Sequence, residues 1–151
     1  MTARRQEQLI KINRSRAASF FAGGRGQLPR ILLVEDDADV RVLMEHVLIG
    51  DRYEVDPAAT VAAADALLQR RHYDLVLADG VLPDGTGMEI ARQAQRSGTP
   101  VIIITAYAFR LPKADLARFE VLLKPVRPSE LLQAVEQALR GETATGSSPP
   151  R

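Results

Sequence analysis

Polar side chains follow four short apolar runs of this sequence, and their types suit phosphoryl chemistry. Three consecutive acids at positions 35–37 follow the first run, Asp79 follows the second, Thr105 the third and Lys124 the fourth. Carboxylates held together repel one another unless a cation lies between them, and Mg²⁺ prefers such oxygen ligands. With Mg²⁺ bound, Asp79 would be a nucleophile toward phosphorus. Lys124 and Thr105 would then contact the transferring phosphoryl oxygens.

The elements that must position these side chains alternate along the chain. Short apolar runs are typical of strands buried on both faces, and apolar residues at helical spacing lie between them. Strands are expected at 31–34, 53–55, 75–78, 101–104 and 121–123. Helices are expected after each strand, including a short one over 111–118 and a last one that begins at Pro128. This alternation predicts an α/β domain with a parallel sheet.

Three helix starts have recognisable capping residues. Asp37 and Thr60 each precede a helical pattern, where a side-chain oxygen would accept hydrogen bonds from the first backbone N–H groups. Thr86 and Glu89 have the spacing of a capping box, in which both residues bond across the first turn.

Ligand chemistry in such sheets lies beyond the carboxyl ends of the strands, so the polar residues are expected at one edge. Taken singly, an Asp after a strand is more often a turn residue or a cap, and a lone Lys is a solvated surface charge. Polar groups at four strand ends cost stability unless they serve a purpose, so their coincidence favours function.

Composition limits the classes of protein that fit. The chain has 151 residues, no cysteine and two histidines, which excludes disulfides and thiolate metal sites. Residues 1–29 carry six Lys or Arg and one acid, whereas residues 30–140 carry thirteen Lys or Arg and seventeen acids. We expect a basic flexible leader over 1–29, one domain over 30–140 and a disordered tail over 141–151. An acidic domain argues against broad nucleic-acid binding, and no membrane span or export signal is apparent, so a cytoplasmic location is expected.

Two stretches of this sequence resemble a known family. The stretch 31–41, which contains Glu35, Asp36 and Asp37, looks like the opening of a response-regulator receiver domain. The stretch 74–87 around Asp79 resembles its phosphoacceptor strand and loop, and the pairs at 105–106 and 124–125 complete the pattern. The resemblance covers roughly residues 30–140. It implies a flavodoxin-like, doubly wound, five-stranded parallel sheet in the order 2-1-3-4-5 with five helices.

The resemblance also implies roles for individual residues. Asp79 would be the phosphoacceptor, and Asp36 would bind Mg²⁺ directly while Glu35 acts through water. The backbone carbonyl of Val81 would complete the protein ligands of the metal. Thr105 and Lys124 would contact the phosphoryl group, whereas Asp37 would only cap its helix.

The sequence departs from the family pattern at three places. Val121 replaces the Tyr or Phe that usually stands three residues before the lysine and takes part in the switch. The segment between Thr105 and Lys124 is a few residues shorter than usual and contains Pro112, so the fourth helix is expected to be short or irregular. Arg127 stands where a capping residue normally precedes Pro128.

Tyr107 and Val81 flank the expected path of the water that would hydrolyse an aspartyl phosphate. One hypothesis is that their bulk and apolarity slow dephosphorylation. The equally weighted alternative is that Tyr107 simply packs on the surface of the fourth helix.

The resemblance implies a receiver of a two-component or phosphorelay system. Its donor would be a histidine kinase or a histidine phosphotransfer protein, its output an unknown protein partner, and a homodimer is possible. The eleven residues after Arg140 leave no room for a DNA-binding domain. One alternative is a degenerate, phosphate-independent receiver that serves as an interaction platform. Another is a phosphatase with an aspartyl intermediate, which Val81 disfavours because the general acid expected there is missing. Catalysis would otherwise be limited to Mg²⁺-dependent self-phosphorylation and autodephosphorylation.

Overall fold

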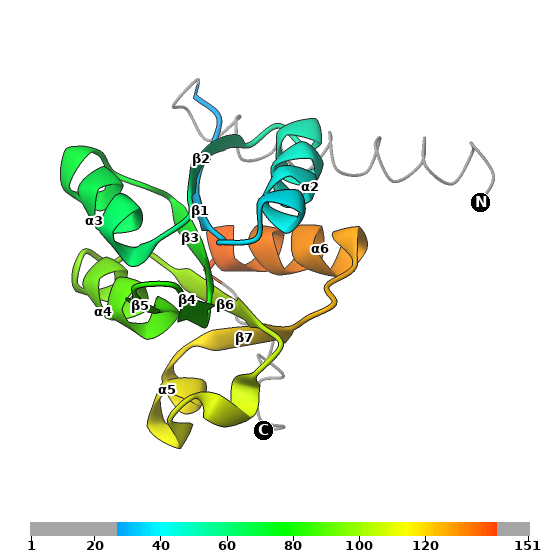
Figure 1. Ribbon diagram of the computed structural model, residues 1–151. Helices are drawn as coiled ribbons and strands as arrows, with labels where there is room; N and C mark the ends of the chain where they lie inside the picture. Colours follow the sequence, from blue (N-terminus) through cyan, green and yellow to red (C-terminus); the bar gives the residue numbers. More distant parts are fainter. Residues whose placement is uncertain (1–26, 142–151) are drawn as a thin grey trace, which may run out of the picture.

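The computed structural model describes residues 27–141 and contains a five-stranded parallel sheet (Figure 1). The strand order is β2-β1-β3-β6-β7, which confirms the predicted 2-1-3-4-5 topology. The strands are β1 (Arg30–Val34), β2 (Glu54–Ala58), β3 (Leu75–Asp79), β6 (Val101–Thr105) and β7 (Glu120–Leu123). A two-stranded antiparallel ribbon, β4 (Val81–Leu82) with β5 (Gly85–Thr86), follows β3 and was not predicted. Most of the predicted leader and tail lies outside the described residues.

Helices cover both faces of the sheet (Figure 1). One face carries α2 (Ala38–Gly50) and α6 (Pro128–Leu139). The other carries α3 (Val61–Arg70), α4 (Gly87–Arg96) and α5 (Lys113–Arg118). Within residues 27–141, no helix is both long and apolar enough to cross a bilayer.

The two covered faces explain why the three central strands, β1, β3 and β6, are almost purely apolar. In β1, Leu32 and Val34 belong to the core beneath α3 and α4, while Ile31 and Leu33 belong to the core beneath α2 and α6. Side chains of a strand alternate between faces, so a sheet covered on both sides needs an apolar residue at every position. All four side chains are at most 1% exposed. The polar residues can therefore begin only where this buried strand ends.

The capping predictions were confirmed in two cases and wrong in one. Asp37 accepts hydrogen bonds from the backbone of Asp39 and Val40, and Thr60 accepts one from Ala63. Thr86 precedes α4 but makes no side-chain capping bond. It is the last residue of β5, and the first N–H of α4, from Gly87, donates instead to the Gly80 carbonyl at 3.2 Å. This bond serves the N–H of Gly87, whereas a capping box would have served the N–H groups of Thr86 and Glu89.

The fourth helical region is short and irregular, as predicted. A 3-10 turn, η1 (Ala108–Arg110), precedes the six-residue α5, which begins after Pro112. Proline has no backbone N–H to donate and a fixed φ, here −57°, so it opens the helix without continuing η1. The second strand is longer than expected. It includes Pro57, which an edge strand tolerates because one side of its ladder is unpaired.

Candidate functional site

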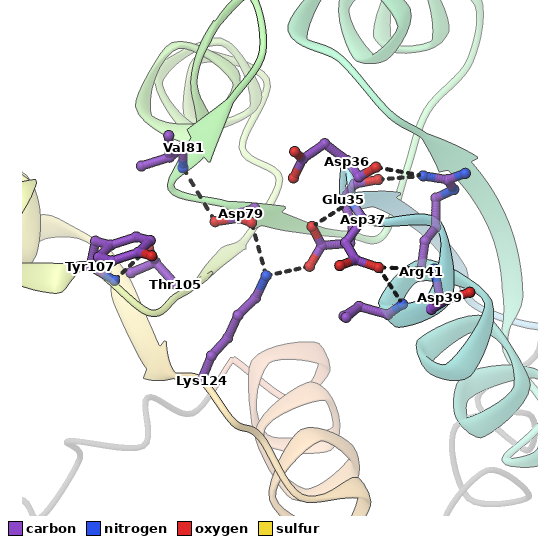
Figure 2. Close-up of polar contacts among 11 residues, drawn as sticks. Glu35, Asp36, Asp37, Asp39, Arg41, Asp79, Val81, Thr105, Tyr107 and Lys124 are labelled. Atoms are coloured by element: carbon purple, nitrogen blue, oxygen red, sulfur yellow. Dashed lines mark hydrogen bonds and ion pairs between the residues drawn. The ribbon is translucent and has the colours of Figure 1, made fainter.

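The carboxyl ends of three central strands and of β7 bring the predicted polar residues to one edge of the sheet (Figure 2). Glu35 and Asp36 follow β1 directly, Asp79 ends β3, Thr105 ends β6 and Lys124 follows β7. These strands are neighbours in the order β1-β3-β6-β7, so residues 89 positions apart come into contact. We call the group formed by Glu35, Asp36, Asp79 and Lys124 the acidic site.

Lys124 lies between two carboxylates of the acidic site. Its Nζ donates to Asp79 Oδ2 at 2.9 Å and also to Glu35 Oε1 (Figure 2). Burial favours the neutral amine, but the hydrogen bonds and charges of Asp79 and Glu35 outweigh it and raise the pKa of Lys124. The lysine is therefore a fixed ammonium group directed at the carboxylate of Asp79.

Glu35 is the most buried acid of the site, with 2% of its surface exposed. Desolvation raises the pKa of Glu35, and the negative charge of Asp79 adds to this, while the contact with Lys124 opposes it. Arg41 does not neutralise the carboxylate, because its Nη1 donates to the backbone carbonyl of Glu35 at 2.8 Å. One ammonium thus faces two carboxylates, with a third, Asp36, close by.

The three acids have the composition of a site for a hard divalent cation. Carboxylate oxygens of Glu35, Asp36 and Asp79 all lie within 4.8 Å of one another. They differ in burial, since Glu35 is buried, Asp79 is partly buried and Asp36 is exposed. Oxygen ligands that include one exposed position suit Mg²⁺, which usually keeps several of its waters. The residues present therefore fit this ion.

The loop after Asp79 is packed tightly against the aspartate. The backbone N–H of Val81 donates to Asp79 Oδ1 at 3.2 Å. Gly87, the first residue of α4, passes so close that a Cβ atom there would lie 2.2 Å from the Asp79 carbonyl oxygen. Only glycine permits this approach, and it places the start of α4 directly against the residue that carries the candidate nucleophile.

Thr105 is completely buried beside the same loop. Its Oγ1 accepts a hydrogen bond from the backbone N–H of Tyr107 at 3.1 Å (Figure 2). The side chains of Tyr107 and Val81 are 45% and 39% exposed. Val121, at the position of the usual aromatic residue, packs partly buried against the core on the side of α5.

The structure brings the predicted residues Glu35, Asp36, Asp79 and Lys124 together, with the Val81 backbone bonded to Asp79 and Thr105 beside Gly80. It adds Asp84, which the sequence analysis missed. Its carboxylate accepts from the backbone N–H groups of Val61 and Ala62 at 2.7 and 3.0 Å, and so caps α3 from the neighbouring loop. The only sequence signal was its place between Pro83 and Gly85, which indicates a turn and not a partner. The peptide bond between Lys124 and Pro125 is cis.

Among protein families, the response regulator receiver domain matches this chain over residues 31–136. Among curated proteins, the chain is 37% identical over 118 residues to the response regulator protein PilR of Pseudomonas aeruginosa. It is 32% identical over 120 residues to the transcriptional regulatory protein ResD of Bacillus subtilis. These alignments cover 74% and 77% of this chain but only 26% and 50% of the relatives.

Solved structures have the same fold. A CheY-like receiver domain protein from Methanospirillum hungatei superposes with a TM-score of 0.70 at 31% identity, over 76% of this chain and 96% of the other. The response regulator TrrA of Thermotoga maritima, solved in complex with Mg²⁺ and BeF, superposes with a TM-score of 0.66 at 28% identity. That alignment covers 74% of this chain and 99% of TrrA.

Proposed function

Because the chain belongs to the response-regulator receiver family of two-component systems, we propose that it accepts a phosphoryl group on Asp79. The donor is a histidine kinase or a histidine phosphotransfer protein, and the output is a protein–protein interaction. The observation that carries the proposal is the contact of Lys124 Nζ with both Asp79 and Glu35, beside the exposed carboxylate of Asp36.

The transfer makes one bond and breaks one. A carboxylate oxygen of Asp79 attacks phosphorus, a P–O bond forms, and the P–N bond to the donor nitrogen breaks as that nitrogen takes up a proton. The N–H of Val81 and the ammonium of Lys124 each bond one oxygen of Asp79, and so orient the carboxylate. Asp36, Asp79 and the carbonyl of Val81 would hold Mg²⁺, with Glu35 acting through water, and the ion would supply positive charge to the phosphoryl oxygens.

Lys124 and Thr105 act on the phosphoryl group itself. The ammonium of Lys124 already lies 2.9 Å from Asp79 Oδ2, so it neutralises charge that develops on the incoming group. Thr105 Oγ1 accepts from Tyr107, which leaves its own hydroxyl proton available for a phosphoryl oxygen. Both residues are fixed by strand ends, so little reorganisation is needed during transfer.

The alternative, a degenerate receiver that ignores phosphate, is not favoured. It accounts for Val121 but not for the complete acidic site, in which Glu35 remains buried at a cost in desolvation. The phosphatase alternative requires a general acid two residues past Asp79, and Val81 has no titratable group. A cytoplasmic location, with the domain over 30–140 as the functional unit, belongs to the same proposal.

Intact-mass measurement after incubation with phosphoramidate and Mg²⁺ tests the proposal. We expect the wild type and Asp65→Ala to gain one phosphoryl group, and Asp79→Ala to gain none. Asp65 is an exposed acid on α3 whose carboxylate accepts from the Gln69 side chain, so it controls for the loss of a surface carboxylate. A wild-type protein that stays unmodified, with phosphoramidate and with histidine-phosphorylated donors, would establish the degenerate alternative.

A further inference from the structure

Helix α2 has an exposed apolar face on the side away from the sheet. Within residues 27–141, three of the seven exposed large apolar side chains belong to this helix: Val42, Leu43 and Ile49 are 52%, 61% and 56% exposed. Its core face is separate, because Met44 and Leu48 are buried against the sheet. Residues three, four or seven positions apart lie on one side of a helix, so Val42 and Ile49 share a face that Leu43 borders. We call these three residues the outer face of α2.

Polar residues on the same side of α2 are mainly acidic. Asp39 is exposed in the first turn, and the partly buried Glu45 lies between Val42 and Ile49 in the sequence. His46 is exposed on the same side. Exposed apolar residues that form a patch mark a binding surface, and acids around the patch favour a partner with positive charge. The outer face therefore fits an apolar and basic segment.

The leader of this chain has that composition. Residues 1–29 carry six Lys or Arg and one acid. Leu9, Ile12, Arg16 and Phe20 recur at helical spacing, so a helix over these residues would place them on one side. Residues 1–26 lie outside the described residues, so this helix is a prediction from the sequence. The predicted side is apolar at both ends and has one arginine between them.

The leader joins the domain beside the end of α2. The carbonyl of Pro29, which precedes β1, accepts a hydrogen bond from the Glu54 N–H at 2.9 Å. The N–H of the neighbouring Tyr53 donates to the Leu48 carbonyl, in the last turn of α2, at 3.2 Å. The entry point is therefore close to Ile49. The glycine-rich residues 23–26 are suited to reversing the chain there, and a helix over 9–20 would be about as long as the 13-residue α2.

We propose that residues 9–20 form a helix that packs on the outer face of α2 and runs parallel to it. Matching residues then meet on successive turns: Phe20 lies over Ile49, Arg16 beside Glu45, and Ile12 over Val42. The spacing of the three leader residues matches that of the three residues on α2 to within one position. This arrangement gives the arginine on the apolar side of the leader an acidic partner. Any protein that binds α2 must first displace the leader, and the inference does not depend on phosphorylation of Asp79.

Disulfide formation in the full chain tests the contact. The natural sequence has no cysteine, so introduced pairs report without background. Ile12→Cys with Val42→Cys should form an intramolecular disulfide under mild oxidation, because packed helices bring facing Cα atoms within the roughly 4.4–6.8 Å that a disulfide spans. The control pair is Ile12→Cys with Ala66→Cys, since Ala66 is exposed on α3 at the opposite face of the sheet. Non-reducing electrophoresis and intact mass measure the product.

The rates and products of oxidation decide between three outcomes. We expect the pair at Val42 to oxidise within one chain about tenfold faster than the pair at Ala66, because docking raises the effective concentration of the two thiols. Equal rates for both pairs would show that the leader has no fixed position and would overturn the proposal. Disulfide-linked dimers of the Val42 pair, in place of the intramolecular product, would also overturn it and assign the outer face to a second copy of the chain.

Limited proteolysis tests the same contact without introduced cysteines. Trypsin should cleave after Lys11 and Arg14 only while the leader is undocked, so the cleavage rate follows the undocked fraction. The double variant Val42→Ser/Ile49→Ser should speed this cleavage by about tenfold. Phe109→Ser removes an 80% exposed apolar side chain elsewhere and should leave the rate unchanged. Equal rates for the double variant and the wild type would overturn the packing on the outer face.

A charge exchange tests the register. Glu45→Arg places two arginines side by side in the proposed contact and should speed cleavage after Lys11 and Arg14 by about threefold or more. Adding Arg16→Glu to that variant restores an opposite pair and should return the rate toward that of the wild type. A second substitution that leaves the rate unchanged or raises it further would overturn the proposed pairing of Arg16 with Glu45.

Discussion

The acidic site and an exposed aromatic cluster, formed by Tyr107, Phe109 and Arg110, lie at the same edge of the sheet but are held in different ways. Asp79 ends a strand buried on both faces, and its carboxylate contacts Lys124 and the Val81 N–H. The aromatic cluster follows β6 on a single 3-10 turn, and its rings contact mainly one another. A fixed centre for chemistry therefore adjoins a surface that few contacts restrain. Loops joined to rigid scaffolds commonly combine these two properties.

The largest expected effect comes from removing the cation of the acidic site. Lys124→Met should slow phosphorylation from phosphoramidate by about 10²–10³-fold, the usual cost of losing one preorganised group that stabilises transferred charge. Measurement of intact mass against time gives the rate. Arg127→Met, which removes an exposed cation three residues away, is the control and should leave the rate unchanged. Equal rates for Lys124→Met and the wild type would show that the ammonium group has no role in the transfer.

A second substitution tests the close packing behind Asp79. Gly87→Ala places a methyl group where a Cβ lies 2.2 Å from the Asp79 carbonyl oxygen, so it should lower the free energy of unfolding by about 1–3 kcal/mol. Gly50→Ala is the matched control, because a Cβ at Gly50 meets nothing within 4 Å. That change should be neutral or slightly stabilising. Urea denaturation of both variants gives the free energies of unfolding. Equal values for Gly87→Ala and Gly50→Ala would contradict the close packing behind Asp79.

The same contrast explains how much the sequence could predict. The residues that end buried strands were identifiable, because an apolar run followed by a carboxylate marks both the strand and its edge. Asp37 and Thr60 were identifiable because their capping bonds are local. Asp84 was not, because the helix that it caps begins 23 residues earlier in the chain. Thr86 was wrongly assigned a capping box because it ends β5, whose pairing with β4 was not predicted.

The fourth helical region contains both a feature that the sequence predicted and one that it could not predict. Pro112 predicted an irregular helix, and η1 and α5 confirm it. The position of the Arg110 guanidinium close to both rings could not be predicted from the sequence, because it depends on side-chain conformations in a turn without a periodic pattern.

A smaller effect is expected from the residues that flank the phosphoryl group. Tyr107 is 45% exposed beside Thr105, and we expect it to hinder the water that hydrolyses the aspartyl phosphate. Tyr107→Glu should accelerate loss of the phosphoryl group by about threefold to tenfold, which corresponds to roughly 1 kcal/mol in the barrier. The measurement is the decay of the phosphorylated mass after removal of phosphoramidate. If the lifetime of the phosphorylated form is unchanged in Tyr107→Glu and in Val81→Asn, neither side chain hinders the hydrolytic water.

The smallest expected effect is at Asp84, where the loop of the acidic site contacts α3. Hydrogen bonds from Ala62 and Val61 lower the pKa of Asp84 below the ordinary aspartate value of 3.8. A lowered folded-state pKa means that the stabilisation is present above the unfolded value and is lost as the pH falls through the folded value. Asp84→Asn keeps one acceptor oxygen and should therefore lower the urea midpoint slightly at pH 7.

The pH dependence separates this role from a generic loss of charge. The difference between Asp84→Asn and the wild type should shrink as the pH is lowered below the ordinary aspartate value, since the wild-type carboxylate then becomes protonated too. Asp65→Asn, on α3 but bonded only to Gln69, is the matched control and should have no such dependence. If both variants behave alike, the contact of Asp84 with α3 adds nothing to the stability of the loop. The rigidity of the acidic site would then rest on Gly87 and Lys124.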